Sequence, residues 1–257
     1  MSNGKRQALL FGLNYAYSAN KLNGCINDVK NIAEYLTNKL TIQCTVFTDD
    51  NDLENTSGIG IIRQLHALAV ASYRDSLEVV YIHYSGHGSY MQDKSYDELD
   101  GRDECLVPSD FLTAGLIRDD YINDVIALFN PLTRVICVFD CCHSGTIGDL
   151  KYSWESPKRA MMENALCDVR CKAITISGCL DKQVSMDAFN VNGDNSYTGA
   201  LTSCLIMVLR EDPLVVSNVF TLITKLRSKL TACGFQQIAK LCSSHNLAKD
   251  CIFIPKN

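Results

Sequence analysis

Two side chains that could carry out covalent catalysis, Cys142 and His87, each follow an apolar run of the chain. Cys142 lies in the motif Asp140-Cys141-Cys142-His143-Ser144-Gly145 after residues 135–139, and His87 lies between two glycines after residues 77–84. Both runs read as buried strands. Ligands bind outside the carboxyl ends of the strands in an open parallel sheet, so both side chains would face one cleft although 55 residues separate them. This arrangement suits nucleophilic catalysis by a thiolate.

Other cysteines and histidines compete for these roles. A thiol with a pKa near ~8.5 is mostly protonated at neutral pH, so the nucleophile needs a partner that favours its charged form, and His87 is the candidate. His83 falls inside its apolar run, where a packed core histidine is expected, and His143 adjoins Cys142 too closely in sequence for an aligned proton transfer. Successive residues leaving a strand point opposite ways, so we expect Cys142 to face the cleft and Cys141 to pack inside.

The glycines beside His87 suit close approach of a substrate to the backbone. The amide hydrogens of Gly88 and Cys142 could form an oxyanion hole. A zinc site is a poor alternative, because zinc ligands usually come as two spaced pairs and only Cys167 with Cys171 approaches that pattern.

Acidic residues are concentrated in two places that could hold a cation. Residues 97–104 contain five acids around one glycine, and the pair Asp119-Asp120 follows. Calcium takes 6 to 8 oxygen ligands, so this density suits calcium, although the match to an EF-hand loop is poor. From composition, a calcium site and a solvated acidic loop are equally good interpretations.

The elements that must position these residues alternate between strand and helix. Such alternation predicts a mostly parallel sheet with helices on both faces, because parallel strands need crossover helices. The pattern predicts strands at residues 7–13, around 46, 77–84, 134–140, 173–177 and 251–254, and helices from an N-cap at 27 or 28 to residue 40, then at 59–73, 121–128, 196–209 and 216–232. Residues 148–170 are polar, lack periodicity and are expected to form an exposed loop.

Length and charge restrict the class of protein. The chain has 257 residues, which suits one large α/β domain. Its net charge of -5 and the lack of basic runs interleaved with aromatics argue against nucleic acid as a partner. No segment approaches the ~20 apolar residues of a membrane span, and the 13 cysteines mostly fall inside apolar runs, so we expect no membrane association and a reducing, cytoplasmic location.

Three motifs give this chain a family resemblance. The motifs Ser85-Gly86-His87-Gly88, residues 97–104 and Asp140-Cys141-Cys142-His143-Ser144-Gly145 together resemble a metacaspase of the caspase-hemoglobinase fold. Residues 22–28 resemble the family's early Gly-Cys-x-Asn-Asp signature, and residues 176–179 with 197–201 resemble the start of its smaller subunit region. The resemblance implies a caspase-like three-layer sandwich forming a single peptidase domain over residues 1–257. Within it, residues 1–150 are larger-subunit-like, 151–171 form an exposed linker loop and 172–257 are smaller-subunit-like.

The resemblance also implies roles for single residues. It implies Cys142 as nucleophile and His87 as base of an endopeptidase that cleaves after Arg or Lys. The pocket for the basic side chain would be formed by Asp28, Ser85 and Asp140, and carboxylates in a partly desolvated pocket do favour a cation. The implied ligands of an activating calcium ion are Asp103, Asp119, Asp120 and Asp149.

The chain resembles a minimal member of the family, without a prodomain or a long insertion between its subunit regions. The basic residues of the linker are possible self-cleavage points or an ordinary solvated surface: Lys151, Lys158, Arg159 and Arg170. The resemblance suggests a monomer, because caspase-like dimers depend on an exposed edge strand and none can be identified in this sequence. The alternative function is a non-proteolytic caspase-fold binding or regulatory protein. Cleavage after acidic residues is disfavoured, because the caspase pattern Gln-Ala-Cys-Arg-Gly is absent.

Overall fold

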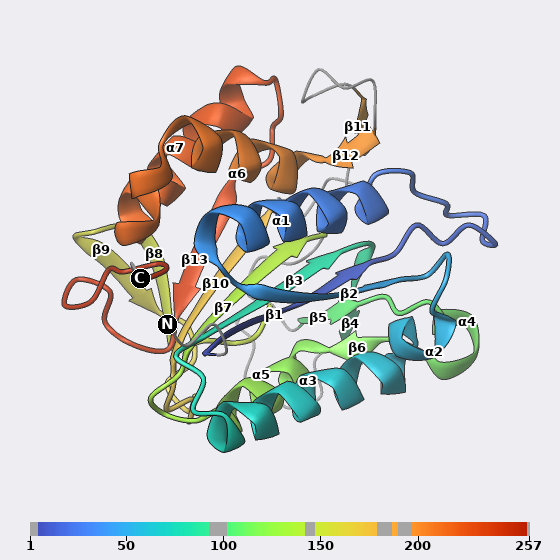
Figure 1. The fold of residues 1–257 in the computed structure, drawn as a ribbon, viewed down its shortest axis with the longest axis horizontal. Helices are drawn as coiled ribbons and strands as arrows, with labels where there is room; N and C mark the ends of the chain where they lie inside the picture. Colours follow the sequence, from blue (N-terminus) through green and yellow to red (C-terminus); the bar gives the residue numbers. More distant parts are fainter. Residues whose placement is uncertain (1–4, 93–101, 142–146, 179–186, 190–196, 256–257) are drawn as a thin grey trace.

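An eight-stranded sheet forms the middle layer of the molecule (Figure 1). The computed structural model describes residues 5–92, 102–141, 147–178, 187–189 and 197–255. The strands, in order across the sheet, are β2 (Gln43–Thr48), β1 (Arg6–Gly12), β3 (Val79–Ser85), β7 (Arg134–Asp140), β10 (Lys172–Gly178), β13 (Ala239–Ser243), β8 (Tyr152–Ser156) and β9 (Arg159–Met162). Strands β2 to β10 of this order are parallel, and the last three pair antiparallel. The predicted mostly parallel sheet is confirmed.

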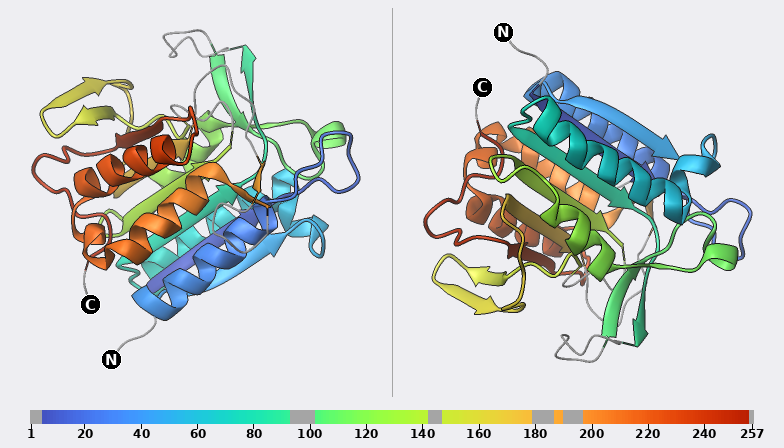
Figure 2. Two further views of the ribbon diagram at one scale, coloured as in Figure 1. Left: turned by 90° about the horizontal axis from the view of Figure 1, so that it is seen from above. Right: turned by 90° about the horizontal axis from the view of Figure 1, so that it is seen from below.

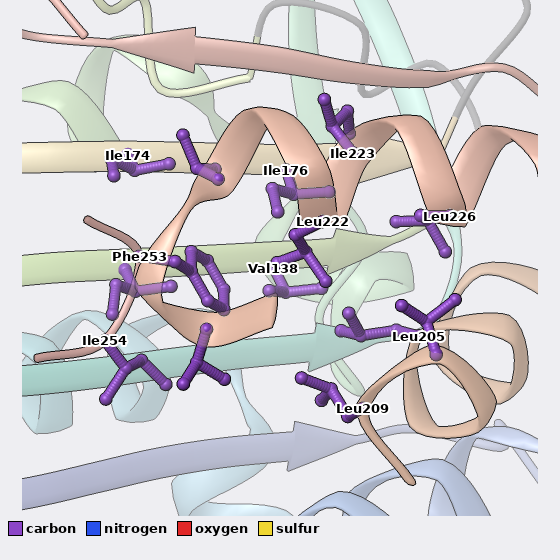
Figure 3. Close-up of a cluster of buried hydrophobic side chains, with 14 of the residues drawn as sticks. Val138, Ile174, Ile176, Leu205, Leu209, Leu222, Ile223, Leu226, Phe253 and Ile254 are labelled. Atoms are coloured by element: carbon purple, nitrogen blue, oxygen red, sulfur yellow. The ribbon is translucent and has the colours of Figure 1, made fainter. Parts of the chain in front are cut away.

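Helices cover both faces of the sheet, as the views from above and below show (Figure 2). One face carries α1 (Cys25–Leu40), α6 (Ala200–Glu211) and α7 (Val219–Ala232), and the other carries α3 (Gly58–Arg74) and α5 (Asp119–Ala127). Each face has its own apolar core cluster. Figure 3 shows the first of them, in which side chains of β7 and β10 meet those of α6, α7 and the segment near the C-terminus: Val138, Ile174, Ile176, Leu205, Leu209, Leu222, Ile223, Leu226, Phe253 and Ile254.

Smaller elements lie at the ends of this sandwich. A second sheet has the order β4 (Gly88–Gln92), β5 (Arg102–Leu106) and β6 (Ile117–Arg118), and a third pairs β11 (Asp187–Phe189) with β12 (Tyr197–Gly199). Short helices are α2 (Leu53–Thr56), α4 (Phe111–Ala114) and the 3₁₀ helix η1 (Pro213–Ser217). Among the described residues, no helix is long and apolar enough to span a membrane.

Several sequence-based expectations need correction. The segment expected as the exposed loop 148–170, and as the linker loop 151–171, contains the hairpin of β8 and β9, because the buried Trp154 anchors it to the sheet with an indole N–H to Ser243 Oγ bond of 2.8 Å. Residues 251–254 form no strand, and β13 was not expected. Helix α1 begins at Cys25, capped by Gly24, so Asp28 lies in its first turn instead of capping it.

The hairpin also removes the basis of the monomer expectation. Its outer strand β9 is exposed along its whole length, so the sheet does end in an edge strand that the sequence did not reveal. The strand has only four residues and carries Arg159, which is paired with Glu155 at 2.8 Å. Its other residues are Ala160, Met161 and Met162, so its shortness is the feature that resists pairing with a second chain.

Candidate active site

The register of β3 on β7 brings the two catalytic motifs to one edge of the sheet. Ser85 pairs with Asp140 at the last position of the ladder, and the Gly86 N–H donates to the Asp140 carbonyl at 3.3 Å. His87 therefore leaves its strand beside the end of β7, two residues past the paired position. Cys142 lies outside the described residues, as do His143 and residues 97, 98 and 100 of the acidic motif. The two motifs were expected to follow strands of one parallel sheet, and the structure shows that these strands, β3 and β7, are neighbours.

A hydrogen bond to the backbone fixes which tautomer of the neutral His87 ring is present. Its Nε2 lies 2.6 Å from the backbone carbonyl oxygen of Asn20. A carbonyl can only accept a hydrogen bond, so Nε2 carries the proton and a neutral ring keeps the lone pair on Nδ1. The ring of Tyr15 lies 4.7 Å from the imidazole, centroid to centroid. The half-buried His87 thus offers Nδ1 as a base.

The competing residues are core residues, as expected. His83 is fully buried, with Nδ1 3.3 Å from the Tyr81 hydroxyl and Nε2 3.1 Å from Thr202 Oγ1. Desolvation lowers the pKa of His83 to about 3, so the ring stays neutral. Cys141 is also fully buried. These two residues pack the interior and face no substrate.

Two buried carboxylates flank a single glycine beside His87. Asp28 accepts the Ser85 hydroxyl at 2.6 Å and the Gly199 N–H at 2.8 Å, and Asp140 accepts the Thr202 N–H at 2.8 Å. Asp28 comes from the first turn of α1, and the two N–H donors come from the start of α6. The expected set of Asp28, Ser85 and Asp140 is therefore brought together at the carboxyl end of β3 and β7.

Both carboxylates of this pair are buried and stabilised by the protein. Both carboxylates are nearly inaccessible, at 0% for Asp28 and 2% for Asp140. The N-terminus of α6 supplies N–H groups and its positive dipole end, which stabilise nearby carboxylates. A Cβ on Gly199 would lie 2.6 Å from Asp28 Oδ2 and would also collide with Asp140 Oδ2, so both carboxylates can approach the backbone this closely because residue 199 is glycine.

A group of three carboxylates lies on the opposite face of the sheet, around the start of α5. One ligand atom from each of Asp119, Asp120 and Asp149 lies within 4.8 Å of the others, and Asp119 and Asp149 are buried. Asp149 has a positive φ of 43°, and the Asn123 amide holds its turn through bonds of 2.7 Å to the Gly148 carbonyl and 3.0 Å to the Asp149 carbonyl. Within the described part of the chain this is the one such group of acidic or metal-binding side chains.

The fourth expected ligand, Asp103, is not part of this group. It is buried and pairs with Arg118 at 3.4 Å, and Arg118 also lies 3.4 Å from Asp120. Asp119 accepts the Glu104 N–H at 3.0 Å, which ties the group to β5. Asp103 therefore contacts the carboxylate group through Arg118.

The possible self-cleavage points differ in exposure. Lys158 and Arg159 lie at and next to the turn of the hairpin, where residues 155–162 are all exposed. Arg170 is exposed but lies between the buried Val169 and Cys171, and Lys151 is half-buried. The hairpin turn is the most accessible of these positions.

Three residues of the site were not predicted from the sequence. Tyr15 and Asn20 contact His87, and the Thr202 N–H donates to Asp140. Tyr15 and Asn20 belong to the loop after β1, a parallel strand that ends at the same edge as β3. The rule used for the cysteine and the histidine, that polar residues directly after a parallel strand face the cleft, would have indicated this loop.

Comparisons with known proteins agree with this geometry. Residues 6–151 match the family model described as metacaspase, peptidase C14 domain. The chain is 31% identical to a metacaspase-1 of Yarrowia lipolytica over 94% of its own length and 62% of that protein, and 31% identical to one of Ajellomyces capsulatus over 98% and 83%. A metacaspase-1 of Saccharomyces cerevisiae is 31% identical over 98% of this chain and 69% of its own.

A solved structure has the same fold. A protein from Geobacter sulfurreducens superposes with a TM-score of 0.65 at 23% identity, covering 93% of each chain. At this identity the likeness concerns the arrangement of sheet and helices.

Proposed function

Because this chain belongs to the metacaspase family of peptidase C14 domains, we propose that it is a cysteine endopeptidase with Cys142 as nucleophile and His87 as base. The observation that carries the proposal is the position of His87 beside the end of β7, with Nε2 bound to the Asn20 carbonyl and Nδ1 left as the basic nitrogen. The motif that contains Cys142 begins at Asp140, the last residue of β7.

The proposed reaction has two halves. In the first, His87 Nδ1 takes the thiol proton, the Cys142 sulfur attacks the scissile carbonyl, and the protonated imidazole then gives its proton to the leaving amine. In the second, water loses a proton to Nδ1 and attacks the acyl-enzyme, which releases the acid and restores the thiol. The amides of Gly88 and Cys142 are proposed as donors to the oxyanion.

We propose Arg or Lys as the residue before the cleaved bond. Asp28 and Asp140 are buried carboxylates on either side of Gly199, and an acidic substrate side chain would meet two like charges there. Ser85 orients Asp28 through its 2.6 Å hydrogen bond.

Calcium is proposed as the activator, held by Asp119, Asp120 and Asp149. The chemistry of the donor set fits, because three carboxylates lie together with two of them buried, and like charges this close favour a hard cation. When bound, calcium would supply the charge that offsets their repulsion. Asp149 follows Cys142 by seven residues, so fixing its turn would restrict the nucleophile segment.

Other properties follow as proposals from the same features. The described cysteines are all free, which supports a reducing, cytoplasmic setting. The β9 edge is only four residues long, which supports a monomer.

The first test compares the two adjacent cysteines. Cleavage of fluorogenic peptides ending in Arg, Lys or Asp is measured with and without millimolar calcium for the unchanged chain, Cys142→Ala and Cys141→Ala. The proposal expects cleavage after Arg or Lys that Cys142→Ala abolishes and Cys141→Ala leaves within a few fold. An inactive Cys141→Ala beside an active Cys142→Ala would reassign the nucleophile. No cleavage by a folded, unmodified chain would favour the non-proteolytic binding role.

The second test concerns the metal. Calcium binding is measured by calorimetry on Cys142→Ala protein, alone and with Asp149→Asn, and Asp168→Asn serves as an exposed control. We expect binding to be lost in Asp149→Asn and kept in the control. Equal binding in both variants would remove Asp149 from the ligand set.

A further inference from the structure

We infer that Tyr15, held in place by Asp49, is a positioning residue for His87. The inference deepens the proposed function and rests on it, because it concerns how the proposed base is oriented. Four observations support it: the anchoring of the Tyr15 backbone, the hydrogen bonds of its hydroxyl, the contact of its ring with the imidazole, and the position of Asn20 in the same loop.

Asp49 anchors the loop that carries Tyr15. Its carboxylate accepts the Asn14 N–H at 2.8 Å and the Tyr15 N–H at 2.6 Å, and it is 5% exposed. Tyr15 has a positive φ of 51°, a conformation that costs a non-glycine residue free energy. Two hydrogen bonds to a buried carboxylate offset that cost. Asp49 directly follows β2, the neighbour of β1, so the sheet register places this anchor.

The Tyr15 hydroxyl is the acceptor for the backbone N–H of His87, at 3.0 Å. The same hydroxyl donates to the Val107 carbonyl at 2.6 Å. The Tyr84 hydroxyl lies 2.9 Å from that of Tyr15, 2.8 Å from the Val107 carbonyl and 3.0 Å from the His87 carbonyl. Desolvation raises the pKa of both tyrosines, so each hydroxyl keeps its single proton.

The two tyrosines differ in which backbone groups depend on their hydroxyls. Without the Tyr84 hydroxyl, the His87 carbonyl still accepts the Val107 N–H at 3.2 Å and the Val107 carbonyl still accepts from Tyr15. Without the Tyr15 hydroxyl, the His87 N–H loses the acceptor seen in the structure. Leaving a partly buried donor unsatisfied is the costly case, so the two hydroxyls are not equivalent.

The loop contacts His87 on three sides. The Tyr15 hydroxyl binds its N–H, the Tyr15 ring lies 4.7 Å from the imidazole, and the Asn20 carbonyl binds Nε2 at 2.6 Å. A Cβ on Gly86 would lie 2.8 Å from the Tyr15 hydroxyl oxygen, so glycine lets the turn approach it. Backbone, ring face and ring nitrogen of the base are therefore all set by one loop anchored on Asp49.

The test compares Tyr15→Phe with Tyr84→Phe. Tyr15→Phe keeps the ring and removes the acceptor, and a small misplacement of a catalytic group can cost about 10²-fold. We expect kcat to fall about 10- to 100-fold with KM within about twofold, and Tyr84→Phe to lose less than about threefold. Asp49→Asn should lose kcat as Tyr15→Phe does, and the double variant no more than either alone. Asp50→Asn, an exposed neighbour, should match the unchanged chain.

A second readout is independent of proteolysis. In ¹⁵N-histidine-labelled protein we expect a slowly exchanging Nε2–H signal from His87 that survives in Tyr84→Phe and is lost in Tyr15→Phe, with thermal unfolding confirming that both are folded. Equal kcat losses in the two variants, a loss confined to KM, or an unchanged Nε2–H signal in Tyr15→Phe would overturn the inference. If the unchanged chain cleaves nothing but the signal behaves as expected, the positioning role stands and the proposed function fails.

Discussion

Replacing Asp28 by Asn tests the proposed pocket for a basic side chain with little change of shape. The Asn oxygen can still accept the Gly199 N–H, and the Ser85 hydroxyl can accept from the new amide, so the hydrogen bonds of 2.8 and 2.6 Å have neutral counterparts. The substitution removes one negative charge from a site where Asp28 is 0% exposed. A substrate cation therefore loses one of its two carboxylates.

The size of the effect follows from the burial of the pair. Two unit charges about 4 Å apart at an effective dielectric constant of about 20 interact by about 4 kcal/mol. Asp140 remains and retains part of the attraction, so we expect a loss of about 3 kcal/mol, which is about 100-fold in kcat/KM at ~1.4 kcal/mol per tenfold.

The assay uses a matched pair of peptides, one ending in arginine and one in citrulline, its uncharged analogue. We expect Asp28→Asn to lower kcat/KM about 100-fold for arginine and less than about threefold for citrulline. Asp168→Asn, an exposed carboxylate, is the control and should leave the ratio unchanged. Equal losses for both peptides would mean that Asp28 supports the structure and does not recognise charge, and the reasoning would be refuted.

Three other predictions concern separate parts of the structure. Gly199→Ala, whose Cβ would meet both pocket carboxylates, should raise KM for the arginine peptide at least 10-fold; an unchanged KM would contradict the pocket. The pKa of His83 is lowered by burial to about 3 against about 6.5 unfolded, so its contribution to stability is complete above pH ~6.5 and about 2 kcal/mol is lost by pH 5. Urea unfolding at pH 7.5 and pH 5.0 should show this difference in the free energy of unfolding for the unchanged chain and not for His83→Asn. An identical pH dependence in the two proteins would contradict the assignment to His83. Self-cleavage, mapped by mass spectrometry, should fall after Lys158 or Arg159 in the exposed turn, and a main fragment beginning at residue 152, after the half-buried Lys151, would contradict the exposure argument.

The strands that hold the site could be predicted because their sequences are unambiguous. Residues of β3 and β7 form apolar runs that end in polar and glycine residues, and all of their side chains are buried. Strands buried on both faces belong to the middle of a parallel sheet, so the edge at which His87 emerges followed from the pattern.

The remaining site contacts could not be predicted because they join distant parts of the chain. The Gly199 N–H donates to Asp28, which lies 171 residues away in the sequence, and the His87 N–H donates to the Tyr15 hydroxyl, 72 residues away. No local periodicity encodes such pairs. Their positions depend on how α6 and the loop after β1 pack on the sheet edge.

The hairpin of β8 and β9 was missed for a different reason. Its outer strand is exposed and its residues show no regular alternation of polar and apolar side chains, so the segment reads as a loop. The indication lay in Trp154, the only tryptophan of the chain, which packs against Phe220 with ring centroids 5.4 Å apart. A large aromatic residue in a segment without periodicity predicts an anchored segment, because burying its ring offsets the ordering of its neighbours.

The most direct test of the central claim is to identify which cysteine reacts with a peptide chloromethyl ketone ending in arginine. The chain has 13 cysteines, so selectivity is informative. Peptide mapping should locate one adduct, on Cys142, with its rate strongly reduced in His87→Ala. An adduct on another cysteine, or equal rates with and without His87, would contradict the account.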